Sequence, residues 1–91
     1  GEAFANPDAA LLITDPEDDW PLIDKLYESY SRLCKETGQP LAKGDADIFR
    51  EFIRDRFQEI QQAHRCKRIE FLLKAGKNRV EIAARPQWGY A

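Results

Sequence analysis

Histidine and cysteine, the residues most often used as nucleophiles, bases and transition-metal ligands, are few in this chain. His64 is the single histidine, and Cys34 and Cys66 are the two cysteines among 91 residues. The spacing of His64 and Cys66 matches no zinc-binding motif, and no third residue that could orient a Cys66 nucleophile is apparent. A histidine near the end of a helix, where the helix dipole favours its cation, is the preferred interpretation. We therefore predict no catalytic residue, no metal site and no cofactor, so that the protein is not an enzyme.

Carboxylates cluster at Asp15, Glu17, Asp18 and Asp19. Oxygen-rich clusters bind calcium or magnesium, but this spacing lacks the central glycine and the distal glutamate of a calcium loop. Acidic side chains before a helix are also stabilised by the helix dipole, and aspartate is a favoured N-cap. We interpret the cluster as the start of a helix.

Basic residues gather near the end of the chain. Residues 65–91 carry 7 basic and 2 acidic side chains, whereas residues 1–64 carry 7 basic and 14 acidic ones. This asymmetry indicates either an electrostatic partner site or internal complementarity between an acidic helical layer and a basic hairpin. In the predicted hairpin, Lys74 and Arg79 face each other, which is unfavourable unless an anion binds there.

Residues 68–85 predict a β-hairpin, because apolar and polar side chains alternate in two runs around the sequence AGKN. With residues 75–78 as the connection, one face of the hairpin is wholly apolar. Leu72 is then an exposed apolar residue on the outward face, beside Glu81. The predicted facing pairs are Leu73 with Val80, Phe71 with Ile82, and Ile69 with Ala84.

Two amphipathic helices are predicted before the hairpin, over residues 20–36 and from Ala46 to about Arg65. Gly38 ends the first helix and Asp45 caps the second. The short connector predicts antiparallel neighbours that cover the apolar face of the hairpin. The apolar run at residues 10–14 is either a short N-terminal third strand or an extended segment that fills the space beside the helix pair.

The predicted element order of strand, helix, helix and hairpin resembles the opening half of the N-acetyltransferase superfamily. The sequence ALLITDPEDDWPLIDKLYESY stands in the place of that family's first strand and helix. The family binds the pyrophosphate of acetyl-CoA through a later Gln/Arg-x-x-Gly-x-Gly/Ala turn, and no such turn occurs in this sequence. The resemblance therefore implies a related fold without carrying the activity over.

Length and composition predict one small α+β domain at residues 10–85, with a flexible N-terminus at residues 1–9 and an aromatic C-terminal tail at residues 86–91. Two cysteines near opposite ends of the helix pair are too far apart to bridge, which predicts free thiols and favours a cytoplasmic location. No apolar run approaches the length of a membrane span, so no membrane partner is expected.

These features predict a small non-catalytic module that binds another protein, possibly a second copy of itself, through the outward hairpin face, the strand edge and the aromatic tail. A regulatory or adaptor role fits such a module. The alternative is a nucleic-acid-binding module that uses the basic hairpin. The predicted partner-binding residues are Arg68, Leu72, Lys74, Lys77, Arg79, Arg85, Trp88 and Tyr90.

Overall fold

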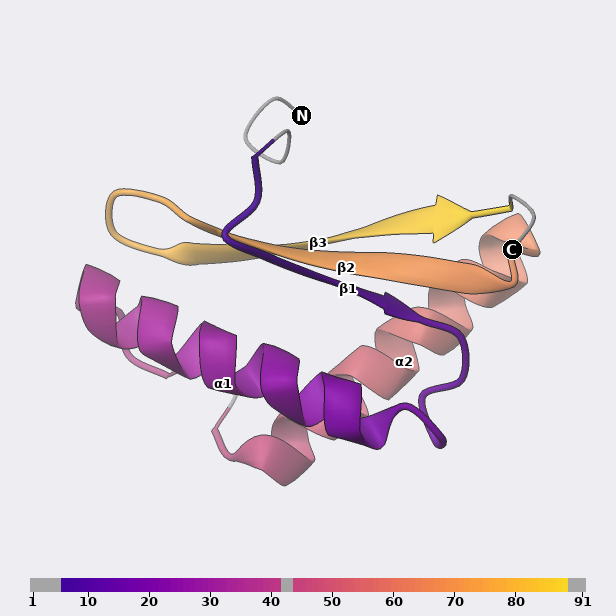
Figure 1. Ribbon diagram of the computed structural model, residues 1–91, viewed down its shortest axis with the longest axis horizontal. Helices are drawn as coiled ribbons and strands as arrows, with labels where there is room; N and C mark the ends of the chain where they lie inside the picture. Colours follow the sequence, from indigo (N-terminus) through magenta and orange to yellow (C-terminus); the bar gives the residue numbers. More distant parts are fainter. Residues whose placement is uncertain (1–5, 42–43, 89–91) are drawn as a thin grey trace.

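The computed structural model describes residues 6–41 and 44–88, which form a three-stranded antiparallel sheet with two helices on one face (Figure 1). β2 lies between β1 and β3. The predicted α+β class, helix pair and C-terminal hairpin are confirmed, and the apolar run near the N-terminus forms the third strand. The elements are β1 (Ala9–Ile13), α1 (Trp20–Thr37), α2 (Ala46–His64), β2 (Arg68–Ala75) and β3 (Val80–Gln87).

Capping residues in the sequence mark the end of α1 and the start of α2. Gly38 follows α1 with a left-handed φ of 72°, a conformation that glycine adopts without a steric penalty. The Asp45 carboxylate accepts a hydrogen bond from the Ile48 N–H at 3.0 Å and so caps α2. Both boundary predictions are confirmed.

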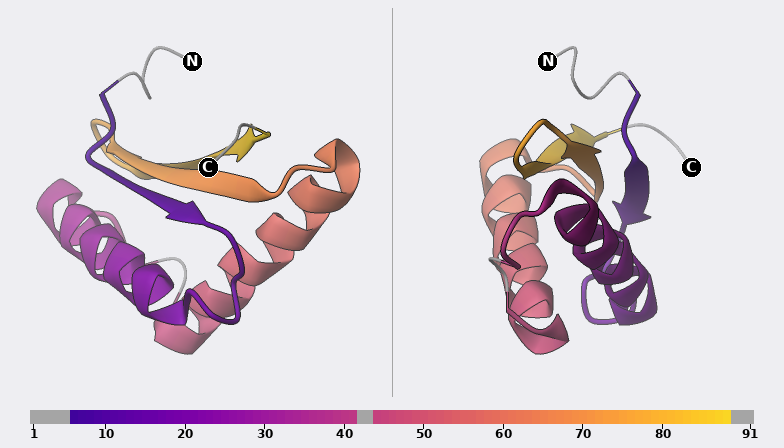
Figure 2. Two further views of the ribbon diagram at one scale, coloured as in Figure 1. Left: turned by 45° about the vertical axis from the view of Figure 1, so that its right-hand side comes forward. Right: turned by 90° about the vertical axis from the view of Figure 1, so that its left-hand side faces the viewer.

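The two helices run in opposite directions along the long axis of the molecule in Figure 1 and diverge as a V in the left view of Figure 2. They contact each other where α1, between Asp24 and Tyr30, meets the first turns of α2. There the rings of Tyr27 and Tyr30 pack against Phe49, with centroids 5.3 Å and 5.4 Å apart. Beyond this contact, each helix covers a different part of the sheet.

The register of the hairpin differs from the predicted one by two residues. Leu73 faces Ile82, and Phe71 faces Ala84. The predicted pairing is wrong because Ala75 and Val80 still pair, so that the connection is residues 76–79. The Gly76 N–H donates to the Arg79 carbonyl at 2.7 Å and closes this loop. A shift of two residues keeps every side chain on its face, so the predicted apolar face is retained.

That apolar face forms the core. Ile69, Phe71 and Leu73 of β2 are at most 1% exposed and lie against buried side chains of both helices. β3 continues through Pro86 to Gln87, two residues beyond the predicted end of the domain. Neither α1 nor α2, the helices of the described residues, has the length and hydropathy of a membrane-spanning segment.

Candidate functional site

The outward face of the hairpin holds most of the predicted basic residues, and their charges are matched locally. A guanidinium nitrogen of Arg79 lies 2.6 Å from a carboxylate oxygen of Glu81, and one of Arg85 lies 3.0 Å from Glu70. The predicted like-charge contact between Lys74 and Arg79 is wrong, because the shifted register places Glu81 opposite Lys74. This pairing therefore gives no reason to expect a bound anion between Lys74 and Arg79.

The remaining basic positions lie at two separate ends of the hairpin. The Lys74 ammonium donates to the Asn6 carbonyl at 2.9 Å and lies 3.9 Å from the Asp8 carboxylate. Lys77 is exposed in the loop and makes no ion pair with a described residue, whereas Arg68, at the other end of β2, has a partner of its own. Six residues of extended strand, about 20 Å, separate Arg68 from Lys74. The predicted basic site is thus divided.

Leu72 lies on the outward face, as predicted, but it is fully buried. The prediction that it is exposed is wrong. Leu72 occupies the middle strand, with Ala10 of β1 and Ala83 of β3 as its direct neighbours. The ion-paired side chains of Glu70 and Lys74 flank it along the strand. Leu72 is therefore not available as a contact residue for a partner.

Trp88 packs against the end of α2. Its indole N–H donates to the His64 carbonyl at 2.8 Å, and its ring meets the His64 ring edge-on with centroids 6.1 Å apart. Trp88 is nevertheless 59% exposed. It satisfies one of the carbonyls left unpaired at the helix end and keeps an open ring surface. Tyr90, the other predicted aromatic contact, lies outside the described residues.

The free edge of β1 presents unpaired backbone. The backbone N–H and C=O groups of the odd-numbered residues of β2 point toward β1. The Leu73 carbonyl accepts from the Asp8 N–H, and the Ala75 N–H donates to the Asp8 carboxylate. Because backbone groups alternate in direction along a strand, the N–H and C=O of Ala10 and Leu12 point away from β2. No described residue hydrogen-bonds to them.

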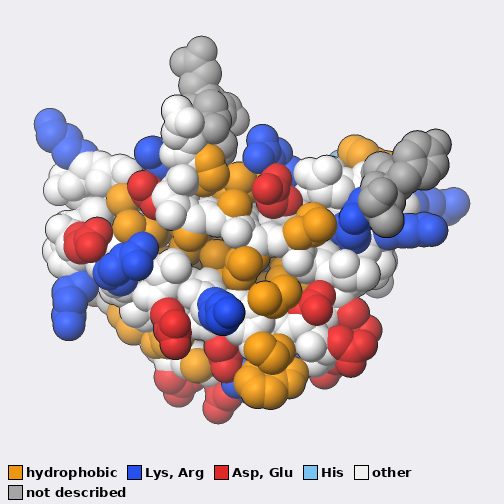
Figure 3. Space-filling model, in the orientation of Figure 1, with side chains coloured by type: hydrophobic (Ala, Val, Ile, Leu, Met, Phe, Trp, Pro, Cys, Tyr) orange, Lys and Arg blue, Asp and Glu red, His pale blue; other side chains and the backbone are white. Residues whose placement is uncertain are grey.

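A groove of about 170 Å³ runs beside this backbone, between β1 and α1. Figure 3 shows a band of hydrophobic side chains across this face of the molecule, over β1 and toward the start of α1. Leu12 is 42% exposed. We define the β1 edge as the outward backbone of Ala10 and Leu12 together with the groove lining, which is Ala9, Ala10, Leu11, Lys25, Leu26 and Ser29.

The opposite edge of the sheet, β3, is better protected against pairing. The Val80 N–H donates to the side-chain carbonyl of Gln39, and Pro86 has no N–H to offer. Ile82 and Ala84 lie between these two closed positions, and the gap beside them has a volume of only about 50 Å³. Proline and charged side chains are the devices that keep edge strands from pairing, and β3 carries both.

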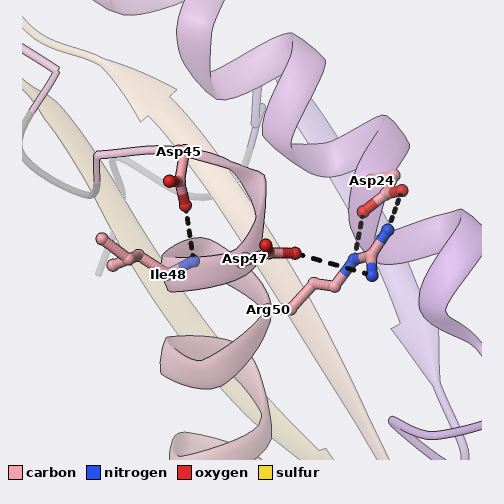
Figure 4. Close-up of polar contacts among 5 residues, drawn as sticks. All are labelled: Asp24, Asp45, Asp47, Ile48 and Arg50. Carbon is pink, nitrogen blue, oxygen red and sulfur yellow. Dashed lines mark hydrogen bonds and ion pairs between the residues drawn. The ribbon is translucent and has the colours of Figure 1, made fainter.

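A larger groove, of about 300 Å³, lies where the two helices begin. Arg50 is one of the residues that line it. Its guanidinium donates to both carboxylate oxygens of Asp24, at 2.7 Å and 2.6 Å (Figure 4), and lies 4.9 Å from the centroid of the Trp20 ring. The hydrogen bonds from Arg50 hold the pKa of Asp24 below its usual value. Asp47 lies 3.9 Å from the same guanidinium. These contacts join α1 to α2 and leave Arg50 no free charge for a ligand.

In the described part of the chain, the cysteines and the acidic cluster occupy structural positions. The side chains of Cys34 and Cys66 are free thiols, as predicted, and both are buried in the core. Asp19 accepts from the Thr14 and Asp15 N–H groups, so that the acidic cluster shapes the turn before α1. Within the described residues, no three His, Cys, Asp or Glu side chains are placed to hold one metal ion.

Comparison with known proteins gives no family for this chain: no family model, curated protein or solved structure matches it. The resemblance in element order to the N-acetyltransferases finds no support in these comparisons. None of the residues of the β1 edge is among the predicted partner-binding residues, although a strand edge is part of the predicted binding surface. The available signal was the uncharged run of β1, AALLI, which has none of the protective residues found in β3.

Proposed function

We propose that this protein is a small non-catalytic interaction module, which binds a protein partner by accepting an extended segment as an additional strand at the β1 edge. The unpaired backbone of Ala10 and Leu12 beside an open groove is the observation that carries this proposal. An added strand satisfies these backbone groups, and the groove receives alternate side chains of the partner.

The groove also defines the chemistry of the partner strand. Ala9, Leu11 and Leu26 supply an apolar floor, and Lys25 and Ser29 supply a cation and a hydroxyl at its rim. Lys25 is exposed and forms no ion pair with a described residue. The groove therefore favours a segment with an apolar side chain at every second position.

Nucleic-acid binding by the hairpin receives less support. Glu81, Glu70 and Asp8 already partner Arg79, Arg85 and Lys74. Binding of a phosphate backbone gains from cations that are free to replace counterions, and these three side chains are engaged within the protein.

The proposal is tested by selecting displayed random peptides on the purified protein and titrating the strongest binder into the ¹⁵N-labelled chain. Amide signals of Ala10, Leu12 and Ser29 are expected to shift, and the Ala10 and Leu12 amides should become protected from hydrogen exchange. Ala10→Pro removes one docking N–H at an edge position where proline is tolerated, and should abolish the shifts.

Ala84→Pro is the matched control, because Ala84 also directs its N–H outward, but from β3. This variant should bind the peptide as the wild type does. Equal loss of binding in both variants, or shifts confined to the hairpin loop, would contradict the proposed site. Failure to select any peptide that perturbs β1 would overturn the proposal.

A further inference from the structure

We infer that the strand added at the β1 edge is β1 of a second copy of this chain, paired antiparallel about a twofold axis at Leu11. This inference rests on the proposed function and names its partner. The two sheets would join into one continuous sheet, with β1 against β1 in the middle and β3 at each outer edge.

The alternating direction of the backbone N–H and C=O groups along β1 selects this register. In an antiparallel pair, residues that exchange hydrogen bonds must both direct their backbone toward the partner. At the β1 edge these residues are Ala10 and Leu12. Pairing Ala10 of one copy with Leu12 of the other uses both residues of both copies, and it places the two Leu11 residues opposite each other in a non-hydrogen-bonded pair.

The neighbouring registers are less favourable because they call on N–H groups that are already engaged. An axis at Ala10 would pair Leu12 with Asp8, whose N–H donates to the Leu73 carbonyl. An axis at Leu12 would pair Ala10 with Thr14, whose N–H donates to the Asp19 carboxylate at 2.9 Å. Only the axis at Leu11 leaves these contacts intact.

Side-chain size and charge are also self-complementary in this register. On the outward face, the half-exposed Leu12 lies opposite Ala10 of the other copy, so that a large side chain meets a small one twice. β1 carries no charged residue, so two copies do not repel each other along the strands. The exposed side chains of α1 beside the edge include both signs, Lys25 and Glu28. β3 offers no such match, since Pro86 and Gln39 close positions along it.

The test is a disulfide scan under mild oxidation. Opposed residues of a non-hydrogen-bonded antiparallel pair have Cα atoms about 4.5 Å apart, within the range that a disulfide spans. Leu11→Cys should therefore yield a covalent dimer. Copies of residue 10 are offset by two residues and lie about 8–9 Å apart, beyond that range, so Ala10→Cys should remain monomeric on a denaturing gel. The native thiols are 2% and 3% exposed and should not react while the chain is folded.

Sedimentation of the unmodified chain gives a second readout that does not depend on a cysteine variant. The wild type is expected to show a dimer fraction that rises with concentration, and Ala10→Pro should stay monomeric at every concentration. Ala84→Pro should dimerise as the wild type does.

Two results would overturn the inference. Equal crosslinking of Ala10→Cys and Leu11→Cys would contradict the register. A wild type that is monomeric at every concentration, with no Leu11→Cys dimer, would rule out self-pairing. The proposed function would survive that second result if selected peptides still bound at β1, so the two failures are distinguishable.

Discussion

At the scale of single residues, Leu72 shows how a position can be placed on the correct face and still be misjudged. Strand alternation puts it outward, yet it is completely buried between neighbours in both adjacent strands. Leu12 lies on the same outward face and is 42% exposed. Leu72 belongs to the middle strand, whereas Leu12 belongs to an edge strand.

Leu72→Ala should therefore destabilise the fold by about 2–3 kcal/mol, because a fully buried leucine loses its packing and leaves a cavity. Leu12→Ala, the matched change at the edge, should cost less than about 1 kcal/mol, because its side chain buries less area. Urea unfolding of both variants measures the difference. Similar free energies of unfolding for the two variants would show that Leu72 is not covered as described.

A second prediction at this scale concerns Asp24. Hydrogen bonds from Arg50 keep the pKa of Asp24 below the usual value near 3.9. A carboxylate whose pKa is lower in the folded than in the unfolded state stabilises the fold above the unfolded pKa. That contribution is lost as pH falls through the folded pKa. Asp24→Asn should thus be less stable than wild type at pH 6, and the difference should shrink as the pH falls below about 4.

The measurement is the urea midpoint of both proteins across this pH range. Asp47→Asn is the control, since Asp47 lies 3.9 Å from Arg50 and its side chain is 89% exposed. It should change the midpoint less than Asp24→Asn does. A pH-independent difference between wild type and Asp24→Asn would mean that lost packing, and not the charge, causes the destabilisation.

At the scale of elements, the two edges of the sheet differ in how well they are protected against pairing with another strand. In β3, the Val80 N–H donates to the side chain of Gln39, which lies just beyond α1, and the strand itself contains a proline and charged residues. β1 has none of these features along residues 9–13. Edge protection of this kind prevents pairing with other chains. This difference between the edges is the basis for the proposal that a partner strand binds at β1.

Gln39→Ala should cost about 1 kcal/mol, because the part-buried Val80 N–H loses its acceptor. Hydrogen exchange at Val80 should become faster, while exchange at Ile69 in the middle strand should change only with global stability. Gln58→Ala, an exposed change on α2, serves as the control and should leave both amides as they are. Unchanged protection at Val80 would contradict the role given to Gln39.

At the scale of the whole molecule, charge is uneven along the chain and yet largely matched within each element. Acidic side chains gather at the lower margin of Figure 3, where the helices begin. Arg50 meets Asp24 between the helices, and Arg79 and Arg85 meet glutamates of the same hairpin. Among the described residues, none of these ion pairs joins a helix to the hairpin, so the contacts do not show the predicted complementarity between an acidic helical layer and a basic hairpin.

A titration with short single-stranded RNA should accordingly give weak hairpin shifts with a shallow dependence on salt. Each phosphate that a protein cation neutralises steepens that dependence. The measurement is an amide-shift titration at low and moderate salt, followed at residues 74–85. Saturable shifts that vanish on adding salt would restore the nucleic-acid alternative and weaken the case for the β1 edge.

The sequence by itself determined the elements and the inner face of the hairpin. Helix caps at Asp45 and Gly38 and the alternation around Phe71 act between residues close in the chain, where propensity and periodicity decide the outcome. The tertiary structure decided the two-residue shift of register, the burial of Leu72 and the choice of the open edge. These depend on contacts between distant segments, such as Gln39 with Val80 and Asp8 with Ala75, which are 41 and 67 residues apart. A local pattern specifies which face a side chain takes, but only the assembled chain specifies what lies against that face.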